Sequence, residues 1–164
     1  MYDDMIHQSF SLLAKSITYA TFSEMMNSGG HDQALVMIVQ SLEIFMKAKL
    51  YNKNKDIIFL EKNDNKTVNI RILPKMFEDE LGIKIDSSAF IEAVDERNKI
   101  MHQGLVVSNP GMVLQLAFNI FIPVLEKYYK DELDSLLRYY FYDDVIFEGY
   151  VLEQLDNYGI LYSD

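Results

Sequence analysis

The chain has 164 residues, of which 49% are hydrophobic, and it carries a formal net charge of −10 at pH 7. This length fits one domain with a sizeable core, and so much apolar sequence excludes a disordered protein. No apolar run approaches the roughly 18–20 residues of a membrane span, and the first residues lack the pattern of a signal peptide. The absence of cysteine excludes disulfides and thiolate metal sites, and it fits a cytoplasmic protein.

The acidic residues are concentrated at one end of the chain. Residues 131–164 carry nine acids and one base, Arg138, and contribute −8 to the net charge, whereas residues 1–130 contribute only −2. Without a broad basic stretch, we do not expect the protein to bind long duplexes through counterion release. The nearly neutral body is compatible with a local site for one exposed RNA loop. The acidic segment 131–164 is also rich in tyrosine and is expected to be a helical extension.

The first part of the chain has the apolar spacing of two helices. Residues 2–27 repeat apolar side chains every three or four positions, and the glycines at 29–30 end the pattern. A second helix is predicted over residues 31 to about 51. Its broad apolar face consists of Leu35, Ile38, Val39, Leu42, Phe45, Met46 and Leu50.

Residues 52–72 do not follow helical spacing. Two runs of β-prone residues, 57–60 and 68–72, flank a polar, asparagine-rich stretch. This pattern predicts a small β-hairpin or a loop insertion near residues 56–72. The stretch is the most basic of the chain, which is typical of a solvated loop; a flap that contacts substrate is the alternative. Its lysines are Lys53, Lys55, Lys62 and Lys66.

Local signals mark where the next two helices begin and end. A short helix is predicted over residues 74 to about 81, with proline in its first turn and Gly82 at its end. The following helix is expected to be capped by residues 86–88 and to end at Gln103-Gly104. The apolar stripe expected on that helix is Phe90, Val94 and Met101.

The last helices complete an all-α bundle. Asn109-Pro110 is a strong helix start, and the very apolar helix from residue 112 to about 129 is expected to be kinked by Pro123. Residues 131–158 predict one or two further helices. The sequence therefore predicts a single helical domain over residues 1–164.

The residues capable of chemistry converge on one stretch, residues 95–104. It contains Arg97, one of three arginines, and His102, one of three histidines. In a helix, Asn98 and His102 lie four positions apart and share a face. Arg97 lies about 140° around an ideal helix from His102, a gap that its long side chain partly closes. Arg97 and Asn98 also interrupt the apolar stripe, which favours a polar cleft or a dimer interface there.

A histidine that moves protons near neutral pH, beside a permanently charged guanidinium, suits RNA cleavage without a metal. His102 would act as general base or acid toward a ribose 2′-hydroxyl, while Arg97 would hold the phosphate. Asn98 would orient the phosphate or the imidazole. No cofactor is needed, and the scattered histidines predict no metal site. The structural alternative is that the arginine and the histidine cap carbonyls or pair with nearby acids such as Asp95 and Glu96.

Three polar residues outside this stretch carry expectations of their own. Glu43 and Lys47 lie four positions apart in the second helix and are expected to form a surface ion pair. Contact of Glu43 with Arg97 is the alternative. His7 lies beside the stripe of the first helix and is expected at the surface or at an interface rather than as a ligand.

Residues 97–102, with the sequence RNKIMH, resemble the motif of the HEPN superfamily, an arginine, a polar residue, three variable residues and a histidine. HEPN domains are small helical bundles, many of them ribonucleases of toxin–antitoxin, abortive-infection and CRISPR-linked systems. The resemblance covers about residues 31–125, and residues 41–50 are similar to the early core helix of such domains. It implies that the arginine and the histidine are catalytic and that Asn98 assists them. It also implies a homodimer in which two motifs face each other across a cleft.

The resemblance predicts a metal-independent endoribonuclease, a toxin or phage-defence effector, acting on tRNA or another structured RNA. An antitoxin or regulatory protein would be a further partner. The alternative is a non-catalytic module of the same fold whose acidic tail, residues 131–164, engages a protein partner or covers the protein's own cleft. A nucleotide-binding bundle has little support, because the sequence contains no glycine-rich phosphate loop.

Overall fold

The computed structural model describes residues 1–26, 30–60, 66–104, 111–141 and 153, which contain helices and one isolated β-bridge but no β-strand. The prediction of an all-α bundle is confirmed. A π-helical segment, Leu116–Phe121, joins α5 to α6, and short 3-10 turns precede α3 and α7. The helices in chain order are α1 (Tyr2–Met26), α2 (His31–Lys53), α3 (Leu73–Leu81), α4 (Ser87–Gln103), α5 (Met112–Gln115), α6 (Ile122–Tyr129) and α7 (Leu133–Tyr140).

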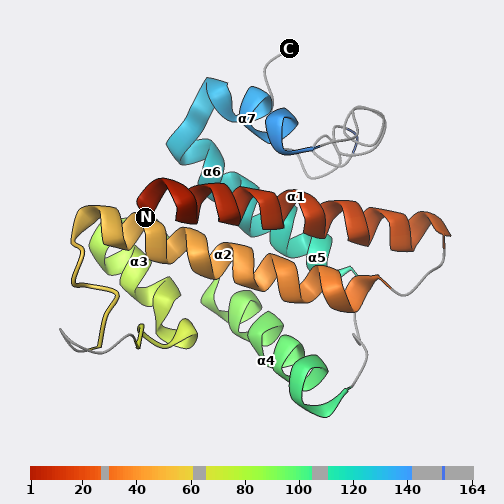
Figure 1. The fold of residues 1–164 in the computed structure, drawn as a ribbon, viewed down its shortest axis with the longest axis horizontal. Coiled ribbons are helices and arrows are strands. Elements are labelled where there is room, and N and C mark those ends of the chain that lie inside the picture. The colour runs from red at the N-terminus through yellow and green to blue at the C-terminus, as the bar shows by residue number, and fades with distance from the viewer. Residues whose placement is uncertain (27–29, 61–65, 105–110, 142–152, 154–164) are drawn as a thin grey trace.

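The first two helices form a long antiparallel pair that the other helices surround. In Figure 1, α5 and α6 lie behind this pair, α4 lies below α2, and α7 lies above α1. The pair is closely packed because small residues face each other where the helices meet. The Ser9 hydroxyl donates to the Ser41 carbonyl at 2.8 Å, and the Ser41 hydroxyl donates to the Ser9 carbonyl at 2.6 Å. These reciprocal hydrogen bonds satisfy two fully buried hydroxyls.

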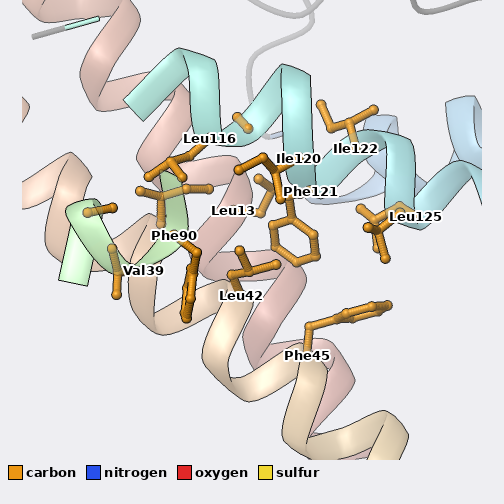
Figure 2. Packing of buried hydrophobic residues seen from close by; sticks show 14 of the residues in the cluster. Leu13, Val39, Leu42, Phe45, Phe90, Leu116, Ile120, Phe121, Ile122 and Leu125 are labelled. Carbon is orange, nitrogen blue, oxygen red and sulfur yellow. The ribbon is translucent and has the colours of Figure 1, made fainter. Parts of the chain in front are cut away.

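The core is centred on the apolar face of α2, all of whose seven predicted members are buried. Phe45 is at its middle, with the Phe121 ring 5.3 Å away and the Tyr128 ring 5.8 Å away, both edge-on. Figure 2 shows Phe45 and Leu42 of α2 facing Phe121, with Phe90 of α4 and Leu13 of α1 beside them. Burial of each such aromatic ring contributes on the order of 2 kcal/mol. The spacing of apolar residues therefore identified the face around which the bundle is built.

The helix predicted over residues 112 to about 129 is divided by the π-helical segment. Proline at position 123 has no amide hydrogen, and in a regular α-helix its ring collides with the carbonyl four positions earlier, at Asn119. The wider turn of Leu116–Phe121 contains Asn119 and ends two residues before Pro123. We attribute the π-helical segment to this proline. The predicted start of the helix at Asn109-Pro110 lies outside the described residues.

Within the described residues of the insertion after α2, one antiparallel bridge joins Phe59 and Thr67. The Val68 amide donates to the Ile58 carbonyl at 2.9 Å, and the side chains of both residues are buried in the core. The described part of the insertion is thus a loop closed by one bridge rather than a hairpin with two regular strands. Residues 61–65, including Lys62, lie outside the described residues.

The acidic extension is described only through its first helix. In α7, Leu137 is buried against the bundle, whereas Tyr139 is 76% exposed. His7 of α1 is exposed, as expected of a surface position, and its Nδ1 lies 3.1 Å from the Tyr140 hydroxyl of α7. Residues 142–152 and 154–164 lie outside the described residues. Among the helices that are described, none is both long enough and apolar enough to cross a membrane.

Lys49 of α2 lies within a group of aromatic rings that joins three helices. Its Nζ is 4.4 Å from the ring centroid of Tyr128 and 5.0–5.5 Å from those of Tyr2, Phe45 and Tyr129. The ammonium also donates to the hydroxyls of Tyr2 at 2.8 Å and of Tyr129 at 3.2 Å. No carboxylate pairs with Lys49 among the residues described, so ring faces and phenol oxygens stabilise its charge.

We predict that Lys49→Met lowers the free energy of unfolding by about 2 kcal/mol, because methionine keeps the apolar stem but loses the attraction to the rings. Urea denaturation followed by circular dichroism measures the change. Lys15→Met is the matched control, since Lys15 is exposed on α1, and it should stay within about 0.5 kcal/mol of wild type. Equal stability of the two variants would contradict a stabilising role for the aromatic group.

Burial, together with the neighbouring Tyr2 and Tyr129, raises the pKa of Tyr128 from its ordinary value of 10.0 to about 12. Between pH 10 and pH 12, Tyr128 is ionised in the unfolded chain but neutral in the folded chain. The contribution of neutral, buried Tyr128 to the free energy of unfolding is therefore complete below pH 10 and is lost as the pH rises toward 12. We therefore expect wild type to lose more stability than Tyr128→Phe between pH 10 and pH 12. Chemical denaturation at several alkaline pH values tests this, and parallel curves for the two proteins would refute it.

Candidate functional site

The candidate residues lie on α4, whose two ends are fixed by local interactions. The Asp86 carboxylate accepts a hydrogen bond from the Ala89 amide at 3.1 Å, which caps the first turn. At the other end Gly104 has a φ of 64°, a left-handed conformation that glycine adopts without strain. The predicted start and stop of this helix are both confirmed, so the 97–102 motif occupies its last two turns.

The apolar stripe predicted for α4 is wrong at one position. Phe90 and Val94 are buried as expected, but Met101 is 59% exposed. No residue of α4 after Glu96 is buried, because the helix diverges from α2 toward its C-terminal end (Figure 1). Met101, His102 and Gln103 are therefore exposed at the end of α4, where a ligand can reach them.

Arg97 is held from two sides in a largely enclosed position. Its side chain is only 17% exposed, and Nη1 lies 3.7 Å from Glu43 Oε2 on α2. Nη2 and Nε donate to Asn98 Oδ1 at 3.0 and 3.3 Å. The guanidinium thus bends toward Asn98 and onto the helix face that Asn98 shares with His102. This arrangement brings two of the three candidate residues into direct contact.

His102 lies apart from that contact. It is exposed in the last turn of α4, and within the described part of the chain it forms no hydrogen bond or ion pair. Nothing in the described structure therefore commits the imidazole to a structural role. The side chain is accessible to a substrate approaching the end of α4.

Glu43 and Lys47 form the predicted pair, but the pair is not a surface one. Lys47 Nζ lies 2.6 Å from Glu43 Oε1, and the two side chains are only 13% and 21% exposed. The expected alternative, contact of Glu43 with Arg97, occurs at the same time through the other carboxylate oxygen. Lys47 also donates to the Thr67 hydroxyl of the insertion at 2.8 Å. Helical spacing could reveal the pair, whereas no sequence signal pointed to Thr67.

Ion pairs give the region around Arg97 a positive balance in an acidic protein. Asp95 pairs with Arg71, and Glu96 pairs with Lys99 at 2.6 Å. Together with Glu43, Lys47 and Arg97, these side chains comprise four cations and three carboxylates. Of these side chains only Lys47, Glu43 and Arg97 are enclosed, at 13–21% exposure, and they comprise two cations and one carboxylate. The one positive charge that remains in this enclosed group is screened less than on an open surface. Such a place attracts an anion such as phosphate.

An apolar groove of about 360 Å³ runs beside the same end of α4. Val36 and Met37 of α2 and Ile100 of α4 form its apolar walls, and Asp32 and Gln33 lie at its edge.

No group of three or more histidine, aspartate and glutamate side chains within the described residues is arranged to hold a metal ion. Comparisons of the chain with protein-family models, with curated proteins and with solved structures find no match.

Proposed function

We propose that the protein is a metal-independent endoribonuclease of HEPN type, acting in the cytoplasm as a toxin or phage-defence effector. The observation that carries this proposal is the disposition of the motif on α4. Arg97 is held by Glu43 and Asn98 within a locally positive region, and His102 is exposed one turn after Asn98. The resemblance of residues 97–102 to the HEPN motif supports the same reading, with tRNA or another structured RNA as the substrate.

The proposed reaction is an attack of a ribose 2′-hydroxyl on the adjacent phosphorus. An imidazole removes the 2′ proton as the new O–P bond forms, and the bond to the 5′-oxygen breaks. The leaving 5′-oxygen takes a proton, which yields a 2′,3′-cyclic phosphate and a 5′-hydroxyl. Arg97 stabilises the charge that builds on the phosphate, because its guanidinium stays charged and carries several donors. Asn98 orients that guanidinium through Oδ1.

The reaction needs both a base and an acid, whereas the motif of one chain contains a single histidine. A homodimer in which two α4 ends face each other would supply the second imidazole. The apolar groove of Val36, Met37 and Ile100 supports this arrangement, because Ile100 places it along the last two turns of α4 and it is open to a second copy. The exposed Met101 adds apolar surface at the same end of α4.

We expect the purified protein to cleave total tRNA or ribosomal RNA in the presence of EDTA and to leave cyclic phosphate ends. His102→Ala should lower the rate about 10²-fold or more, because it removes the proton transfer. Arg97→Ala should lower it by a similar factor through lost charge stabilisation. Fragment-end mapping and initial rates provide the measurement.

His7→Ala and Arg138→Ala are the matched controls for these two variants, since both residues lie on α1 or α7, away from α4. Each control should cleave RNA at the wild-type rate. RNA cleavage retained in both Arg97→Ala and His102→Ala would contradict the proposed function. No cleavage by folded wild-type protein would instead favour a non-catalytic module that binds a protein partner.

The homodimer is tested separately from the chemistry. Met37→Glu places a charge in the apolar groove and should raise the dimer dissociation constant about tenfold or more, because a buried unpaired carboxylate is costly. Tyr139→Glu is the control, since Tyr139 is an exposed apolar side chain on α7. Sedimentation equilibrium measures both constants. A monomeric wild-type protein, or equal dissociation constants for the two variants, would refute the proposed interface.

A further inference from the structure

We propose that Thr67 of the insertion sets the position of Arg97 through Lys47 and Glu43, so that the insertion regulates the α4 site. The catalytic consequence of this link rests on the proposed ribonuclease function, whereas the link itself does not. Thr67 and Lys47 are positioning residues in this account, because neither of them is proposed to touch the RNA.

Three contacts form the link between the insertion and α4. The Thr67 hydroxyl accepts from Lys47 Nζ at 2.8 Å, and Lys47 Nζ lies 2.6 Å from Glu43 Oε1. The other oxygen of Glu43 faces Arg97 Nη1 at 3.7 Å. These residues come from three segments that are separate in the sequence, the insertion, α2 and α4. The link therefore exists only in the folded protein.

The backbone around Thr67 is well anchored. Thr67 forms the antiparallel bridge with Phe59, and the next residue, Val68, is buried and donates its amide to the Ile58 carbonyl. The Thr67 hydroxyl thus has a fixed location from which it can hold the Lys47 ammonium. A change in the insertion that moved Thr67 would therefore change the position of the Lys47 ammonium.

The distances around Glu43 indicate what the link does. Two cations share one carboxylate, and Lys47 holds the closer contact at 2.6 Å. The 3.7 Å separation from Arg97 is longer than a hydrogen bond, so Glu43 attracts the guanidinium without engaging it in a bidentate pair. Nitrogen donors of Arg97 therefore remain available for a phosphate. If Lys47 released Oε1, the carboxylate would be free to bind Arg97 with both oxygens and neutralise it.

The first experiment follows the Arg97 Nε–H signal by ¹⁵N nuclear magnetic resonance. The chain has only three arginines, so the signal can be assigned by its loss in Arg97→Lys. Thr67→Val removes the acceptor for Lys47 and should shift the Arg97 signal, whereas Thr67→Ser should retain the wild-type position. Thr18→Val is the matched control, because the Thr18 hydroxyl donates within α1, to the Ala14 carbonyl at 2.8 Å, and contacts neither the insertion nor α4 among the described residues.

If Thr67 served only in packing, Thr67→Val would be less stable than wild type but its Arg97 signal would not move. This result would overturn the link. If Thr67→Val does not fold, Lys47→Gln replaces it, since glutamine retains a donor for Thr67 but removes the charge that holds Glu43. An Arg97 signal unchanged in Lys47→Gln would also overturn the proposal.

The second experiment measures RNA cleavage by the same variants. Thr67→Val should lower kcat/KM about tenfold, and Thr67→Ser and Thr18→Val should stay within about twofold of wild type. Cleavage unaffected by Thr67→Val, despite a shifted Arg97 signal, would overturn the regulatory consequence. If wild type cleaves no RNA, the proposed function fails, while the Arg97 signal still decides whether the link exists.

Discussion

The structure depends on the burial of one face of α2. That face supplies the middle of the core, where Phe45 meets Phe121 and Tyr128, and it pairs with α1 through the buried hydroxyls of Ser9 and Ser41. Because α2 contacts α1, α3, α4 and α5, its position determines where each of those helices lies. The same rigid helix carries Glu43 and Lys47 at the edge of the core. The candidate site is therefore supported by the most extensively packed element of the bundle.

The ion-paired side chains Glu43, Lys47 and Arg97 at the edge of the core are not what the stability of the fold alone would favour. Removing ammonium, guanidinium and carboxylate groups from water costs free energy that their mutual attraction only partly offsets, and apolar residues of similar size often serve a fold better. Lys47, Glu43 and Arg97 are nevertheless held together at low exposure, with Thr67 and Asn98 as further partners. Enclosure of this kind strengthens the field of the remaining positive charge. It is a suitable environment for an anionic substrate, which is the physical basis of the proposed phosphate contact.

The distribution of charge separates two parts of the molecule. The net charge of −10 comes mostly from residues 131–164, and α7, the described start of that segment, packs on the side of α1 away from α4 (Figure 1). The motif region, by contrast, has more cations than carboxylates among its ion pairs. An overall acidic composition therefore does not by itself argue against an RNA-binding site. The local balance around Arg97 determines what that site attracts.

The sequence alone determined the elements whose signals are local. Helical spacing identified the core face of α2, Asp86 marked the start of α4, and Gly82 and Gly104 marked helix ends, because caps and left-handed glycines act within about one turn. The motif residues were also visible in the sequence, although their catalytic role and the homodimer remain predictions.

Only the tertiary structure decided which distant residues meet. It joined Arg97 to Glu43 and Lys47 to Thr67, left Met101 exposed, and favoured a loop over a hairpin in the part of the insertion that it describes. These outcomes depend on where α4 diverges from α2 and on how the insertion is anchored at Ile58 and Val68. Spacing along one helix carries no information about such contacts, because they arise from the packing of separate segments.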